Sequence, residues 1–144
     1  MSTHIIHVFI SHAWSRSEHY DTIADWVFEQ NWSIGQASIV FKNFSVPKND
    51  PIHDAESDKE LEEAIFRKIS RSHVIVIPTG MYASYRKWIQ KEIDGSKSYK
   101  KPILAVNPWG QKRKSSIVLD NADDEAGWNA KSVVTKIWNL YYNS

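Results

Sequence analysis

The sequence predicts an α/β domain, a three-layer sandwich with a central parallel sheet of four to five strands flanked by helices. Short aliphatic runs, of which Val74 to Ile77 and Ile103 to Val106 are the clearest, have the length and β-branched composition of buried strands. Amphipathic helical patterns alternate with these runs along the chain. This alternation indicates a parallel sheet, because each crossover helix returns the chain to the same edge.

Two further strands are expected nearer the N-terminus. Ile5 to Ile10 is apolar except for His7, and its β-branched residues favour a strand over a helical turn. Ser38 to Phe41 is a second short strand, followed by a polar loop over 43–57 that is long enough to cover a site. His4 and His7 should point to opposite faces of the first strand, because side chains alternate along a strand.

Helices are predicted where apolar residues recur every three or four positions. Ser17 to about Glu29 is one such segment, and a second begins at Ser57, where Glu60 completes a capping-box pattern. A last helix is expected from roughly Asn129 to Tyr142, with one apolar side that covers the sheet. The acidic stretch from Asp120 to Glu125 is interpreted as a solvated loop.

Composition limits the classes of function. The 144 residues suit one domain over 1–144, and a formal charge of +1 gives no field that would gather nucleic acid or an anionic membrane. The chain has no cysteine, which excludes disulfides and thiolate chemistry and fits a reducing compartment. The apolar runs are too short to span a bilayer, and the N-terminus lacks a signal-peptide pattern. We expect a cytoplasmic protein that binds neither nucleic acid nor membrane.

Polar and aromatic residues follow the predicted strands, where ligands bind in a parallel α/β sheet. Taken singly, Ser11 and Asn43 are ordinary turn residues, and His12 is an ordinary loop histidine. Their coincidence at one edge of the sheet is what favours a binding site. The candidate substrate-binding residues at this edge are Ser11, His12, Trp14, Asn43, Tyr82, Ser84, Trp88 and Trp109.

The segment from Met81 to Ile93 places Trp88 and Glu92 four residues apart. If the segment is helical, the indole ring and the carboxylate share one face. Alone, Trp88 would be a core anchor and Glu92 a solvated carboxylate. Together they suit a ribosyl ring that must be held while it loses a leaving group, and Glu92 is the candidate catalytic residue.

Other chemistries find little support in the sequence. The five glycines form neither a dinucleotide fingerprint nor a P-loop, so a redox dehydrogenase is not expected. The six histidines lack metal-ligand spacing, and we predict no metal and no cofactor. A phospho-receiver domain would need acids where Ser11 and Pro78 stand.

Several motifs, taken together, resemble the TIR-like family, which was first described as flavodoxin-like, and within it the TIR proteins of Thoeris anti-phage defence. The motifs are Phe-Ile-Ser-His at 9–12, Asn-Phe-Ser-Val-Pro at 43–47, Met-Tyr-Ala-Ser at 81–84, the Trp88 to Glu92 spacing, and Asn-Pro-Trp-Gly at 107–110. The resemblance covers nearly the whole chain.

The resemblance implies an enzyme that takes NAD⁺ as its substrate and cleaves the nicotinamide glycosidic bond. The product would be a cyclic or conjugated ADP-ribose signal that activates a separate effector protein after phage infection. The family's catalytic glutamate, at the start of the helix after the third strand, maps to Glu92, its serine to Ser11, and its polar loop residue to Asn43. A phage-derived trigger and self-association are also implied.

Two other hypotheses remain open. The chain is alternatively a non-catalytic TIR-type interaction module, since each candidate residue has an ordinary structural explanation. A flavin or nucleotide carrier is suggested by fold analogy alone.

Overall fold

The structure, a computed structural model, describes residues 2–11, 17–44, 58–79, 86–107 and 116–143. Six strands in this part of the chain form one sheet with the order β2-β3-β1-β4-β5-β6. The strands are β1 (Ser2–Ile10), β2 (Trp32–Ile34), β3 (Ala37–Asn43), β4 (Val74–Pro78), β5 (Ile103–Val106) and β6 (Asp124–Ala126). The helices are α1 (Ser17–Phe28), α2 (Asp58–Ser70), α3 (Arg86–Ser98), α4 (Ser116–Asn121) and α5 (Ala130–Tyr142).

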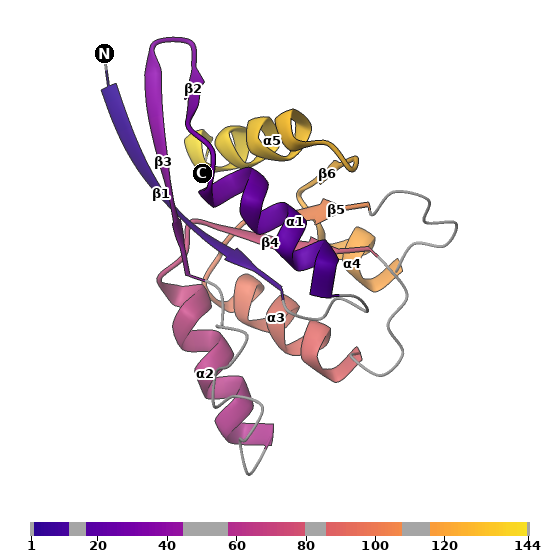
Figure 1. The fold of residues 1–144 in the computed structure, drawn as a ribbon. Helices are drawn as coiled ribbons and strands as arrows, with labels where there is room; N and C mark the ends of the chain where they lie inside the picture. Colours follow the sequence, from indigo (N-terminus) through magenta and orange to yellow (C-terminus); the bar gives the residue numbers. More distant parts are fainter. Residues whose placement is uncertain (1, 12–16, 45–57, 80–85, 108–115, 144) are drawn as a thin grey trace.

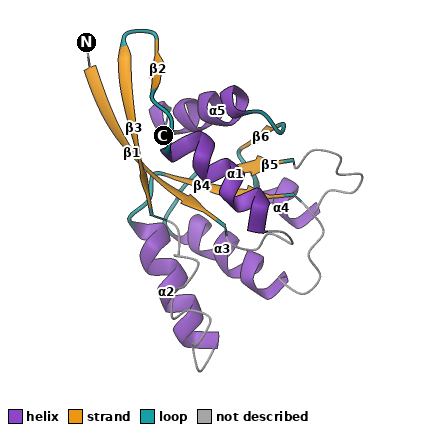
Figure 2. Ribbon diagram, in the orientation of Figure 1, coloured by secondary structure: helices purple, strands orange, loops and turns teal. Residues whose placement is uncertain are grey.

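Five of these strands run parallel, which confirms the predicted α/β class. Numbered among themselves along the chain, β3, β1, β4, β5 and β6 have the order 2-1-3-4-5, which is the flavodoxin-like arrangement. The sixth strand, β2, is antiparallel to β3 and adds a hairpin at the sheet edge. Figure 2 shows this mixed sheet between two layers of helices.

Helices cover the two faces of the sheet in separate groups (Figure 1). Helices α1 and α5 pack on one face, where the core includes Ile6, Val8 and Ile10 of β1. Helices α2, α3 and α4 pack on the other face, where β1 contributes Phe9. The alternation of β1 side chains between the two cores follows from the two-residue period of a strand.

The predicted positions of His4 and His7 on opposite faces of β1 are confirmed. The ring of His4 meets Trp138 of α5 edge-on, with 5.0 Å between ring centroids. The ring of His7 instead stacks on Phe44, with a centroid distance of 4.1 Å.

The strongly periodic segments are found close to their predicted bounds. The predicted strand over Ile103 to Val106 is identical to β5, and β4 extends its predicted range by one residue. Helix α5 begins after Asn129, whose side chain accepts a hydrogen bond from the backbone of Ser132. No helix among the described residues is long and apolar enough to span a membrane.

Three short elements were not predicted: β2, α4 and β6. The turn between β2 and β3 consists of Gly35 and Gln36, and Gly35 has a φ of 60°, which a two-residue hairpin loop requires and glycine tolerates. The interpretation of 120–125 as a solvated loop was wrong. Asp120 lies in α4, and Asp124 is the first residue of β6. The strand β6 forms by pairing with β5 at the edge of the sheet, where acidic side chains remain partly solvated.

Candidate functional site

A buried pair, Ser11 and Glu92, joins the end of β1 to α3. The Ser11 hydroxyl donates a hydrogen bond of 2.6 Å to Oε1 of Glu92, a length typical of a hydroxyl bound to a carboxylate. Both residues are 0% exposed. The ordinary expectation of a solvated Glu92 is therefore wrong, because α3 turns this side chain toward the sheet. Among the described residues, Glu92 is the one charged side chain that is fully buried.

Glu92 occupies a position in α3 that packing alone would assign to an apolar residue. Ile89, Glu92, Ile93 and Ser96 recur at helical spacing, and all four are buried. Glutamate is rarely fully buried, since desolvating a carboxylate is unfavourable unless it is paired or has a functional role. This stripe was visible in the sequence and could have identified Glu92 as buried.

The pair lies at the point where ligands bind in flavodoxin-like sheets. The chain adds β3 on one side of β1 and then β4, β5 and β6 on the other side, so the strand order reverses between β1 and β4. The crevice beyond the carboxyl ends of these two strands is the topological switch point. Ser11 follows β1 directly, and its backbone N–H donates to the carbonyl of Val76 in β4 at 2.9 Å. The Ser11–Glu92 pair thus lies at the carboxyl edge of the sheet beside the switch point.

Trp88 and Glu92 both lie in α3, so the part of the segment that contains them is helical, as the expectation of a shared face required. The backbone of Trp88 is one turn before Glu92, while its side chain lies outside the described residues. Glu92 is the seventh residue of a thirteen-residue helix, so the expectation that it lies at the helix start was wrong. Five other candidates, His12, Trp14, Tyr82, Ser84 and Trp109, also lie outside the described residues.

Asn43 is at the carboxyl edge but not beside Glu92. It is the last residue of β3, and its Nδ2 donates to the hydroxyl of Tyr20 in α1 at 3.3 Å. In the β1–β3 register Asn43 pairs with Val8, three residues before Ser11, which places it roughly 10 Å back along the strand direction. The structure therefore brings Ser11 and Glu92 together and leaves Asn43 on the α1 side.

A second polar group at the carboxyl edge joins Asn107, which belongs to the Asn-Pro-Trp-Gly motif, to Thr79 and Glu125, which the sequence analysis did not propose as site residues. The hydroxyl of Thr79, which is 0% exposed, donates to Oδ1 of Asn107 at 2.6 Å. Nδ2 of Asn107 in turn donates to Oε1 of Glu125 at 2.6 Å. Each residue follows or belongs to a different strand, so only the strand order places them in contact. The position of Thr79 after the aliphatic run of β4 was the available signal.

A hollow of about 530 Å³ lies at the opposite, amino-terminal edge of the sheet. It is lined by the last turns of α3 and α5, by the turn before β5 and by the start of β6, and includes Lys97, Lys101 and Asp123. Lysines there are explained by the partial negative charge at helix C-termini. The hollow shares no residue with the Ser11–Glu92 pair, which is the candidate functional site. No group of three potential metal-ligating side chains occurs within the described ranges.

The fold and the site define a flavodoxin-like α/β protein with a buried serine and glutamate at its switch point. A family model described as "Thoeris protein ThsB, TIR-like domain" matches residues 9–113, most of the chain. The protein therefore belongs to this TIR-like family.

Among solved structures, a 3-dehydroquinate dehydratase-like protein from Bifidobacterium longum aligns with 99% of this chain and 98% of its own. Its sequence identity is 9% and its TM-score 0.44, so this likeness carries no argument. No curated protein matches the chain significantly.

Proposed function

We propose that the protein cleaves the nicotinamide glycosidic bond of NAD⁺ and releases a cyclic or conjugated ADP-ribose signal in anti-phage defence. The observation that carries the proposal is the fully buried Glu92, bound by Ser11 at the switch point of a TIR-like domain. The signal would activate a separate effector protein.

One carboxylate is enough for this reaction. Ordinary glycoside hydrolysis needs a second carboxyl group to protonate an alkoxide leaving group. In NAD⁺ the bond between the ribose C1′ and the pyridinium nitrogen breaks with both electrons moving to the nitrogen, so nicotinamide leaves as a neutral molecule. Positive charge then develops on the ribose, and a carboxylate beside it stabilises the transition state more than the ground state. A nucleophile, from the same molecule for a cyclic product or from a second molecule for a conjugated one, then bonds to C1′ and loses its proton to solvent.

The Ser11 hydroxyl positions the carboxylate for this role. Its hydrogen bond to Oε1 holds the Glu92 side chain at the strand end, and α3 supplies the remaining packing through Ile89 and Ile93. A preorganised charged group stabilises a transition state without reorganising during the reaction. Ser11 is thus a positioning residue in this proposal, and Glu92 the catalytic one.

The burial of Glu92 also supports a resting state that needs activation. Both carboxylate oxygens are closed to solvent, so a substrate contacts them only after neighbouring groups move. A phage-derived trigger or self-association would supply that rearrangement. The proposal therefore includes low activity of the isolated protein.

Glu92→Gln tests the proposal, because the amide retains the shape of the side chain and its ability to accept from Ser11 but removes the charge. We expect nicotinamide release to fall roughly a hundredfold to a thousandfold. Mass spectrometry of small molecules from phage-infected cells carrying wild type or Glu92→Gln measures this loss and identifies the product. Glu63→Gln, an exposed change on α2, is the matched control.

The proposal fails if wild-type protein in infected extract releases no nicotinamide and Glu92→Gln still protects cells. In that case the second candidate, a non-catalytic interaction module, gains support. Ile5 and Val40, paired neighbours on β1 and β3, are 51% and 43% exposed and give such a module an apolar contact surface. Replacing both with serine would then abolish protection while Glu92→Gln would not.

A further inference from the structure

The Thr79–Asn107–Glu125 chain of hydrogen bonds orients a carboxylate that the proposed reaction has not used. The chemistry of the groups fixes its direction. A carboxylate only accepts hydrogen bonds, so Asn107 must present Nδ2 to Glu125 and Oδ1 to Thr79. The Thr79 hydroxyl must then donate, and it is buried away from competing water. The chain ends on Glu125, whose side chain is exposed.

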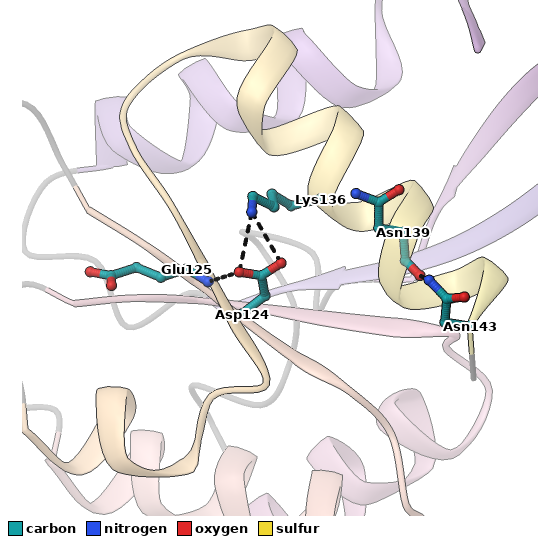
Figure 3. Close-up of polar contacts among 5 residues, drawn as sticks. All are labelled: Asp124, Glu125, Lys136, Asn139 and Asn143. Atoms are coloured by element: carbon teal, nitrogen blue, oxygen red, sulfur yellow. Dashed lines mark hydrogen bonds and ion pairs between the residues drawn. The ribbon is translucent and has the colours of Figure 1, made fainter. Parts of the chain in front are cut away.

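Backbone pairing holds the three residues in register. The N–H of Thr79 donates to the carbonyl of Val106 at 3.0 Å, and the N–H of Asn107 donates to the carbonyl of Ala126 at 2.9 Å. On β6, Asp124 and Glu125 point in opposite directions, Asp124 toward Lys136 of α5 and Glu125 away from it (Figure 3). The ion pair of Lys136 with Asp124, at 3.3 Å, ties β6 to α5 and leaves Glu125 facing the other side of the sheet.

Glu125 and Glu92 lie on the same side of the sheet. Side chains two residues apart on an extended strand point to the same face. The core under α2, α3 and α4 includes Phe9, Ile77 and Ala105, and two residues after these come Ser11, Thr79 and Asn107, respectively. Glu125 pairs with Ala105 in the register of β5 and β6. The polar groups thus form a row across β1, β4, β5 and β6. Three strand spacings, roughly 14 Å in all, separate its two ends.

A row with a carboxylate at each end suits a molecule with two riboses. A carboxylate accepts hydrogen bonds from ribose hydroxyls, and dinucleotide-binding folds use an Asp or Glu in this way on the 2′-hydroxyl of the adenosine ribose. An extended dinucleotide is long enough to lie along the row. We propose that Glu125, positioned by Asn107 and Thr79, binds the adenosine ribose of the dinucleotide whose nicotinamide ribose lies against Glu92. This inference rests on the proposed function.

The same contact would select against a 2′-phosphate. A phosphate on the adenosine ribose would bring negative charge against the Glu125 carboxylate and remove the hydroxyl that donates to it. Glu125 would therefore make the site specific for the unphosphorylated dinucleotide. The segment matched by the family model ends at residue 113, before Glu125, so the family match does not assign this role.

Binding of ADP-ribose and of its 2′-phosphate, measured by calorimetry, tests the inference without needing bond cleavage. We expect wild-type protein to bind ADP-ribose at least tenfold more tightly than the 2′-phosphate. Glu125→Gln should weaken ADP-ribose binding about tenfold and remove most of the preference. Asp124→Asn, the neighbour that points the other way, is the matched control and should keep the preference.

The positioning role of Thr79 has its own readout. Thr79→Val removes the hydroxyl at nearly constant shape and should reduce the preference severalfold, while Thr79→Ser should restore it. If Thr79→Val fails to fold, the exposed Glu125→Gln still decides the question.

Glu125 is exposed in the resting state, so its contact with the adenosine ribose does not require the rearrangement at Glu92. Equal binding of both ligands by wild-type protein, absence of binding, or unchanged binding by Glu125→Gln would each overturn the inference. These outcomes differ from failure of the proposed function, which is read separately from nicotinamide release. Loss of release in Glu92→Gln with unchanged binding by Glu125→Gln would leave the function standing and this inference overturned.

Discussion

Helices α3 and α5 are both thirteen residues long and pack on opposite faces of the same sheet, yet their buried stripes differ in chemistry. In α5 the buried residues are Val133, Val134 and Ile137. In α3 the stripe includes Glu92 and Ser96 beside two isoleucines. The two stripes pack against the sheet with the same helical spacing, and in α5 apolar residues alone fill it. Packing therefore does not require the polar residues of α3. The comparison indicates that α5 stabilises the sheet, whereas α3 also carries the proposed catalytic residue.

Exchanging the chemistry of the two stripes is the strongest test of this comparison. Val133 matches Glu92 in the stripe pattern, and Val133→Glu would bury a charge without a partner, destabilising the protein by about 3 to 5 kcal/mol. Glu92→Met, similar in shape and apolar, should leave the free energy of unfolding unchanged or raise it while abolishing activity. Urea unfolding followed by tryptophan fluorescence measures both. A large loss of stability in Glu92→Met would make Glu92 structural.

Removing the hydroxyl partner of Glu92 should have the next largest effect. Ser11→Ala leaves the buried carboxylate without that donor, which costs about 1 to 3 kcal/mol of stability. We also expect nicotinamide release to fall about tenfold, since a single lost hydrogen bond of about 1.4 kcal/mol has that effect. Ser96→Ala is the control, because Ser96 donates to the backbone carbonyl of Glu92 rather than to its carboxylate. Equal activity of the two variants would contradict the positioning role.

The contact between α3 and α2 offers a smaller test, with no counterpart in α5. An added Cβ at Gly95 would lie 2.8 Å from Cδ1 of Phe66 and 3.1 Å from Cδ1 of Ile69. Gly95→Ala should therefore destabilise the protein by about 1 to 2 kcal/mol, because the steric cost exceeds the helix-propensity gain of about 1 kcal/mol. Gly127→Ala meets nothing within 4 Å and is the control. A stabilised Gly95→Ala variant would mean that the Phe66 and Ile69 side chains of α2 move aside at little energetic cost.

The smallest effect is expected at the amino end of β4, far from the polar row. Nδ1 of His73 accepts from the N–H of His7 at 2.9 Å, which requires the unprotonated nitrogen. Burial, then the charges of His7 and Lys101, lower the pKa of His73 below 6.5. The unfolded chain therefore binds this proton more readily, so stability is greatest above pH 6.5 and falls as pH decreases through that value.

Urea unfolding at several pH values between 5 and 8 measures this dependence. His73→Asn retains a side-chain acceptor without a titrating group, so its stability should vary less with pH. An unchanged slope in this variant would assign the pH dependence to other groups.

The sequence alone determined the class of fold and most of the regular elements. Aliphatic runs such as Ile103 to Val106 and periodic segments such as α5 are recognisable because burial imposes a repeat on the chain itself. The spacing of Trp88 and Glu92 within one helix was determined in the same way. The short β6 carried no such repeat, because three residues at a sheet edge are ordered by pairing with β5.

Only the tertiary structure decided which polar residues meet. Ser11 and Glu92 are 81 residues apart in the chain, and they make contact because α3 packs on the face of the sheet beside the end of β1. Asn43 was predicted at the same edge, but its side chain bonds Tyr20 on the α1 side. The β1–β3 register pairs Asn43 with Val8, three residues before Ser11. The Thr79–Asn107–Glu125 chain likewise depends on β4, β5 and β6 being neighbours. A sequence encodes local periodicity directly, whereas contacts between strand ends depend on strand order and register, which are set by the packing of the whole sheet.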